Sequence, residues 1–66
     1  MRRQGYTKDE AAQLVEGDVV EFYTGLVWVT AEVLEPLRDA GSPKGLTVRV
    51  TNGTYATEAA PNELRP

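Results

Sequence analysis

Hydrophobic and polar residues alternate with a period of two along most of this chain, which predicts short, half-buried β-strands. Val20 and Phe22 begin the pattern, and apolar residues recur at every second position from 27 to 33. Thr24-Gly25 between them is a short turn signal. A two-residue hairpin loop there would place Phe22 opposite Val27 and Val20 opposite Val29. Because both pairs are apolar, this register buries one face of the first hairpin.

A second hairpin is predicted over residues 46–58. Leu46, Val48 and Val50 alternate with polar residues, and the Asn52-Gly53 pair that follows accepts positive φ at both positions. A two-residue loop at this pair would set Val50 opposite Tyr55, Val48 opposite Thr57 and Arg49 opposite Ala56. The segment between the hairpins, residues 35–45, contains two prolines and two glycines, so we predict a surface loop there.

The two ends of the chain carry helix signals. Thr7 is followed three residues later by Glu10, the capping-box spacing, and Gly17 can end a helix, so we predict a helix of about two turns over 8–15. Residues 61–64 predict one helical turn that places Leu64 at an end of the core. We expect a flexible tail over 1–6 and a single domain over 7–66. The expected core is apolar: Val20, Phe22, Val27, Val29, Ala31, Val33, Leu46, Val48, Val50 and Leu64.

Length and composition narrow the fold and the chemistry. Four or five short strands in 66 residues favour a mainly β domain, a small, partly open barrel with a short N-terminal helix. The chain has no cysteine and no histidine, which excludes the usual metal, haem and thiol chemistry. Ser42, the sole serine, has no base available to activate it, and the carboxylates lack the spacing for acid–base work. We therefore expect no enzyme, no catalytic residue, no metal site and no cofactor.

Charge and hydropathy bear on partners and location. Ten acidic residues against seven basic ones give a formal net charge of −3, which disfavours a nucleic-acid-coating protein. No run approaches the ~18 apolar residues of a membrane helix, and the N-terminus lacks the apolar stretch of a secretory signal. A cytoplasmic protein without membrane contact is expected. The absence of isoleucine and the excess of arginine over lysine are typical of GC-rich bacterial or phage genomes.

An ordered set of short motifs runs from residue 17 to the end of the chain: Gly17-Asp18-x-Val20, Trp28-x-x-Ala31-x-Val33, Val48-x-Val50 and Glu63-Leu64-Arg65-Pro66. In this order they resemble the Tudor and Agenet domains. The resemblance implies a five-stranded SH3-like barrel over 17–66 that binds peptides, often peptides with methylated lysine or arginine. It also implies an aromatic cage at one end of the barrel, in which Tyr23, Trp28 and Tyr55 match three positions and Val50 falls at the fourth.

The candidate ligand-binding residues are therefore Tyr23, Trp28 and Tyr55, with Glu21 and Glu32 as flanking carboxylates. Strand alternation puts Trp28 on the face opposite the core, where it is either an exposed anchor or covered by the 35–45 loop or the N-terminal helix. Tyr55 falls on the Val50 side, so a core position and a ligand contact are both open.

These features favour a non-catalytic interaction module that binds a peptide or protein partner, with aromatic area supplying affinity and carboxylates a preference for basic residues. One alternative is a nucleic-acid-binding SH3-like domain, in which Arg38, Lys44 and Arg49 would contact phosphates. Another is a small structural or inhibitory accessory protein. The sequence decides neither the ligand nor the oligomeric state.

Overall fold

The computed structural model describes residues 5–66, and more than half of these lie in β-strands, which confirms the expected mainly β class. In chain order the elements are the helix α1 (Lys8–Ala11), the strands β1 (Val19–Tyr23), β2 (Trp28–Ser42), β3 (Gly45–Thr51) and β4 (Ala56–Ala59), the 3-10 turn η1 (Pro61–Glu63) and the strand β5 (Leu64–Arg65).

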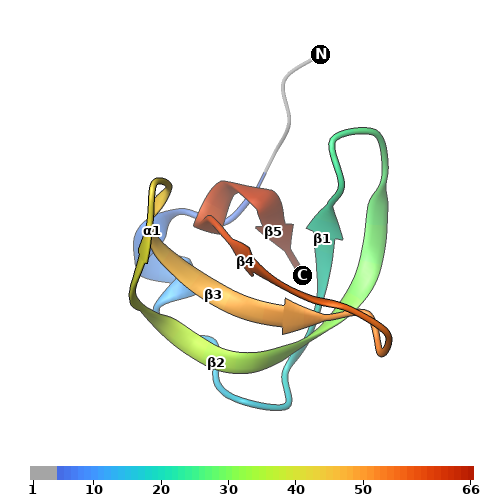
Figure 1. The fold of residues 1–66 in the computed structure, drawn as a ribbon, viewed down its shortest axis with the longest axis horizontal. Coiled ribbons are helices and arrows are strands. Elements are labelled where there is room, and N and C mark those ends of the chain that lie inside the picture. The colour runs from blue at the N-terminus through green and yellow to red at the C-terminus, as the bar shows by residue number, and fades with distance from the viewer. Residues whose placement is uncertain (1–4) are drawn as a thin grey trace.

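The five strands form one antiparallel sheet in the order β4-β3-β2-β1-β5. Figure 1 shows that β2 and β3 are long and curved, so the sheet bends around its own inner face. Within residues 5–66 no pairing joins β4 to β5, and the sheet is open between its two edges.

The core lies on the inner face of this sheet. Val20 of β1 and Val33 of β2 are buried there, and η1 places Leu64, which is also buried, at the start of β5. The full set of buried apolar residues is Ala11, Leu14, Val20, Ala31, Val33, Val48, Val50, Ala59 and Leu64. Six of the predicted core residues are among them, whereas Phe22, Val29 and Leu46 are partly buried. The prediction for Val27 is wrong, because 57% of this residue is exposed.

Both hairpins are displaced by two residues from the predicted register. Phe22 pairs with Val29 instead of Val27, and Val50 pairs with Thr57 instead of Tyr55. The cause is a polar side chain at the first loop position. Thr24 Oγ1 accepts the amides of residues 26 and 27, and Asn52 Oδ1 accepts those of residues 54 and 55, so each loop closes over four residues. A shift of the strand register by two residues leaves each side chain on the same face of the sheet.

The surface loop predicted over 35–45 is wrong. β2 continues to Ser42 and pairs with β3 as far as Ser42 opposite Gly45. Three shifts of register interrupt this ladder, and Pro36 lies in one of them, between the pairs made by Glu35 and Arg38. A bulge accepts a proline because the residue there need not donate to the ladder. The turn is the two residues 43–44, and Gly45 follows with a φ of 87°.

The N-terminal helix is one turn instead of the two predicted over 8–15. The capping box is present, since Thr7 Oγ1 accepts the Glu10 amide and Glu10 Oε1 accepts the Thr7 amide. Beyond Ala11 the amides of Gln13 and Leu14 donate to carbonyls three residues back, as in a turn, and the Val15 amide donates to Asp18 Oδ2 at 2.9 Å. Of the expected tail, residues 1–4 lie outside the described part of the chain, and the Tyr6 amide donates to the Leu64 carbonyl at 2.8 Å. Across residues 5–66, the helices are too short or too polar to span a bilayer.

Candidate functional site

An apolar groove opens on the inner face of the sheet, between the β1–β2 loop and the β3–β4 loop. It encloses about 240 Å³. Its apolar lining comes from β1, β2 and β3, while β4 and the loop before it form one wall. The lining residues are uncharged throughout: Phe22, Thr24, Val29, Ala31, Val50, Thr51, Asn52, Tyr55, Ala56 and Thr57.

The groove exists because the inner face extends beyond the part that the core covers. Phe22 and Val29 are directly opposite one another, and Val20 and Ala31 form the next inner pair toward the core. Such partners share one face of the sheet. The sheet is open between its edges β4 and β5, and near this opening both Phe22 and Val29 are only partly buried. The alternating pattern that builds the core therefore also builds the lining of the groove.

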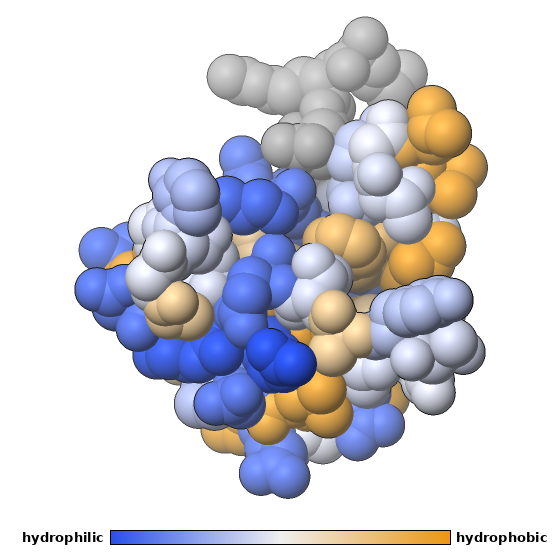
Figure 2. All heavy atoms as spheres, viewed as in Figure 1, coloured by the Kyte–Doolittle hydropathy of each residue, from blue (hydrophilic) through white to orange (hydrophobic). Residues whose placement is uncertain are grey.

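The two loops that contribute Thr24 and Tyr55 to the groove also carry exposed apolar side chains. Leu26 and Val27, in the loop between β1 and β2, are 88% and 57% exposed, and Tyr55, just before β4, is 76% exposed. Figure 2 shows hydrophobic surface gathered over the end of the β1–β2 hairpin, at the right of the view. Large apolar side chains held this far into solvent beside an apolar groove are typical of an interaction surface.

Trp28 lies on the other face of the hairpin, in a compact cluster. Its ring centroid is 5.1 Å from that of Tyr23, its strand partner, with the planes tilted by 51°. The guanidinium carbon of Arg65 lies 4.2 Å from the Trp28 centroid, and Arg65 Nε donates to Glu21 Oε1 at 2.6 Å. Neither the 35–45 segment nor α1 provides this contact. Instead, β5 brings a cation of the chain itself onto the indole.

The structure thus divides the predicted site residues among three places. Tyr23, Trp28 and Glu21 belong to the Arg65 cluster on the outer face. Tyr55 lies in the wall of the groove. Glu32 is exposed on the outer face beside Val19, its strand partner.

Sequence reasoning missed the other groove residues for identifiable reasons. The alternation placed Phe22 and Val29 on the inner face, and they are there. Where the core ends along that face depends on where the sheet is open, which alternation does not encode. Leu26 and Val27 carried a usable signal only together, since adjacent large apolar residues in a loop can form an exposed apolar patch.

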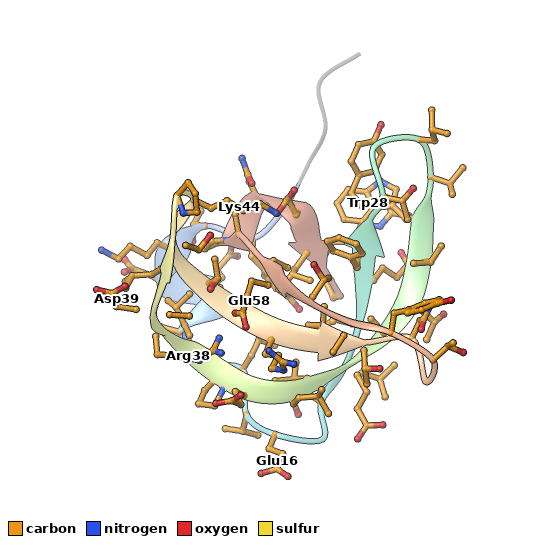
Figure 3. All side chains as sticks on the ribbon, viewed as in Figure 1. Glu16, Trp28, Arg38, Asp39, Lys44 and Glu58 are labelled. Atoms are coloured by element: carbon orange, nitrogen blue, oxygen red, sulfur yellow. The ribbon has the colours of Figure 1, made fainter. Side chains whose placement is uncertain are left out.

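A polar network occupies the outer face of β2, β3 and β4, opposite the core residues of these strands. Glu58 accepts two hydrogen bonds from Arg38, at 2.6 and 2.9 Å, and one from Arg49 at 3.2 Å. Thr47 Oγ1, which is buried, donates to the same carboxylate at 2.8 Å. In Figure 3 Arg38 and Glu58 lie on the same side of the sheet, and Figure 2 shows hydrophilic surface over this region.

This network sets the main shift in ionisation. The hydrogen bonds from Arg38, together with those from Thr47 and Arg49, lower the pKa of the Glu58 carboxyl to about 2, against the opposing effect of desolvation. The same pair raises the pKa of the Arg38 guanidinium, through its hydrogen bonds to Glu58. Separately, burial raises the pKa of the Tyr6 phenol, and the carboxylates of Asp18 and Glu10 raise it further.

Among residues 5–66, histidine, cysteine and carboxylate side chains form no group of three that could hold a metal ion. Comparison with protein-family models found no match, and neither the curated proteins nor the solved structures gave a significant one.

Proposed function

We propose that this chain is a non-catalytic interaction module that binds a peptide segment of a protein partner in the groove between its two hairpin loops. The observation that carries the proposal is the groove itself, an uncharged, mainly apolar surface between two loops that expose Leu26, Val27 and Tyr55. Burial of such side chains in a complex, aromatic ones above all, is the usual source of affinity at protein interfaces.

The proposed architecture is an SH3-like barrel of the Tudor or Agenet type. Two observations support it. The sheet has the five strands that the resemblance implies, and it is bent, with the last strand placed beside the first. The groove also lies at one end of this bent sheet, between two hairpin loops, where the resemblance places the ligand.

The chemistry of the groove favours an apolar anchor over a methylated cation. A cation in an aromatic cage is stabilised by several ring faces and by nearby carboxylates. Here Trp28 already contacts Arg65, and the aromatic residues of the groove are Phe22 and Tyr55. Glu21 is paired with Arg65. An aliphatic or aromatic side chain fits the groove better, since its transfer from water requires no charged partner.

Nucleic-acid binding is the less favoured alternative. Arg38, Lys44 and Arg49 each lie within ion-pair distance of a carboxylate, at 2.6, 2.9 and 3.2 Å. Their partners are Glu58 and Glu63. A phosphate backbone would have to compete with these pairs, and neutralised cations release few counterions.

A random-peptide phage library selected on the purified chain tests the proposal, with affinities of the enriched peptides measured by fluorescence anisotropy. Tyr55→Ser removes an aromatic side chain that lines the groove and is expected to weaken binding about tenfold or more, as truncation of an interface hot spot does. Tyr55 is 76% exposed in a loop, so the variant should keep its fold.

Val19→Ser is the matched control. Val19 is also apolar and 71% exposed, but it lies on the outer face and is not among the residues that line the groove. Its substitution should leave the affinity within about twofold of wild type. Failure to enrich any peptide, or equal losses in the two variants, would count against the groove as the binding surface.

A further inference from the structure

β4 is an edge strand, and its free side borders the groove. Among residues 5–66 its one pairing partner is β3, in the register Thr51 opposite Ala56 and Val50 opposite Thr57. Ala56 and Thr57 also line the groove. An edge strand presents main-chain donors and acceptors that another extended chain can use.

The hydrogen-bond pattern identifies which groups face outward. The Asn52 amide donates to the Tyr55 carbonyl at 3.2 Å, so this pair begins the ladder as a hydrogen-bonded pair. In antiparallel strands such pairs alternate with non-bonded ones. The amide and carbonyl of Thr57 therefore face β3, whereas those of Ala56 and Glu58 face the free side of β4. The Glu58 carbonyl bears this out, since it accepts Lys44 Nζ at 3.2 Å.

We infer that the groove binds its peptide as an extended strand added to β4, with one apolar side chain of the peptide inserted into the groove. This inference rests on the proposed function and specifies its binding mode. Side chains of an added strand point alternately to its two faces. A strand bonded to Ala56 would thus direct every second residue toward the inner face, where Phe22 and Val29 lie. A cavity of about 150 Å³ holds a benzene ring, so the groove's 240 Å³ suits one large apolar side chain.

A peptide fits the surface better than a second copy of this chain does. The exposed side chains of Leu26, Val27 and Tyr55 and the small groove form a patch of limited area. Apolar patches on monomers reach about 300–600 Å², below the ~800 Å² per partner of standard stable interfaces. The surface is also uncharged, which gives no electrostatic reason to prefer a strongly acidic or basic partner. The inferred occupant is an extended segment with a leucine or aromatic anchor and no charge at the anchor position.

Lys44 limits where the added strand can pair. Its ammonium group covers the Glu58 carbonyl and also contacts Glu63 Oε1 at 2.9 Å. A lysine over an edge is a common means of blocking strand addition. The available groups are then the amide and carbonyl of Ala56 and the amide of Glu58, so we expect two or three main-chain hydrogen bonds.

An amide N-methylation scan of a library-selected peptide tests this binding mode against the wild-type chain. N-methylation removes a donor without changing the side chain. Methylation of a peptide amide that faces β4 should lower affinity about 3- to 10-fold or more, because it removes a hydrogen bond and the methyl group collides with β4. Methylation of the intervening amides, which face away from β4, should be tolerated. The expected result is therefore an alternating pattern along the peptide.

Ala56→Pro provides the matching change in the protein. It removes an amide that does not donate to β3, and proline is tolerated on edge strands, so circular dichroism should remain that of wild type. Binding should weaken at least threefold. If the variant does not fold, the peptide scan alone decides.

The outcomes separate the two claims. Peptides that bind with no alternation in the scan, while still depending on Tyr55, would overturn strand addition and leave the interaction module standing. Affinity equal to wild type in folded Ala56→Pro would also overturn strand addition. Failure to select any peptide would overturn the proposed function itself.

Discussion

The guanidinium group of Arg65 covers one face of the Trp28 indole, with 4.2 Å between the guanidinium carbon and the ring centroid. The same guanidinium is held by Glu21 at 2.6 Å, so β5 is tied to the β1–β2 hairpin by a side-chain contact as well as by its two main-chain pairs. Because β5 is only two residues long, this contact adds to the few that hold it, which include the buried side chain of Leu64 and the Tyr6 amide bonded to its carbonyl.

Arg65→Ala should therefore destabilise the domain by about 1 kcal/mol, from the lost cation–π and ion-pair contacts. It should also expose Trp28 and shift its fluorescence to longer wavelength. Urea unfolding followed by Trp28 emission measures both effects in one experiment. Arg65→Lys keeps the charge but not the planar group, so its stability and emission wavelength should lie between those of wild type and Arg65→Ala. An unchanged emission spectrum and unchanged stability would show that Arg65 does not contact the indole in solution.

The sequence predicted the faces of the strands more reliably than their pairing. Alternation is a property of the chain itself, and it placed Val20, Ala31, Val33, Val48 and Val50 in the core, where they lie. Register depends on loop length, and loop length here is decided by single polar side chains. A displacement of two residues preserves every face, so the pattern alone could not detect it.

Asn52 shows how strongly one such side chain acts. Its Oδ1 accepts the amides of Thr54 and Tyr55, both at 2.9 Å. Asn52→Ala removes both bonds, so we expect a loss of about 1–2 kcal/mol in the free energy of unfolding, measured by urea titration. Asn62→Ala, at an exposed position in η1, is the control and should change stability by less than about 0.5 kcal/mol. Equal effects of the two substitutions would argue against the four-residue loop.

The candidate site was predicted only in part, again for a physical reason. Tyr23, Trp28 and Glu21 do lie together, because they share the outer face of one hairpin. Alternation could not tell whether Tyr55 lies near these three residues. Its position depends on the four-residue loop and on where the sheet opens. Those are tertiary properties, set by which strand edges meet.

Residues 35–45 give the sharpest disagreement between sequence and structure. Proline and glycine favoured a loop, whereas the structure pairs Arg38 with Thr47 and Asp39 with Leu46. Bulges absorb Pro36, so the remaining residues can keep pairing. Hydrogen exchange measured by NMR should show ladder amides of this segment exchanging about a hundredfold or more slower than unstructured peptide. The amide of Gly25, in the loop between β1 and β2, provides the internal comparison. If the amides of residues 35–45 exchange as fast as the loop amide, this segment is a loop in solution and not a paired strand.

Glu58 should make the domain sensitive to acid. Its pKa is about 2 in the folded chain, below the ordinary value of 4.5, because Arg38 and its neighbours stabilise the carboxylate. A lowered pKa means that the unfolded state binds the proton more readily. The stabilisation is therefore fully present above pH 4.5 and is lost as the pH falls from 4.5 toward 2. Since the carboxylate is partly exposed, we expect about 1–3 kcal/mol from this group.

Glu58→Gln isolates that contribution, because glutamine keeps the size and one acceptor but cannot titrate. The variant should be less stable than wild type at pH 7 by about 1–3 kcal/mol. The difference should shrink as the pH falls below 4.5, since the wild type then loses the same charge. Glu32→Gln, at an exposed carboxylate of β2, is the matched control and should leave the acid dependence unchanged. If the free energy of unfolding changes with pH in the same way for wild type and Glu58→Gln between pH 7 and pH 2, the Glu58 charge adds no stability.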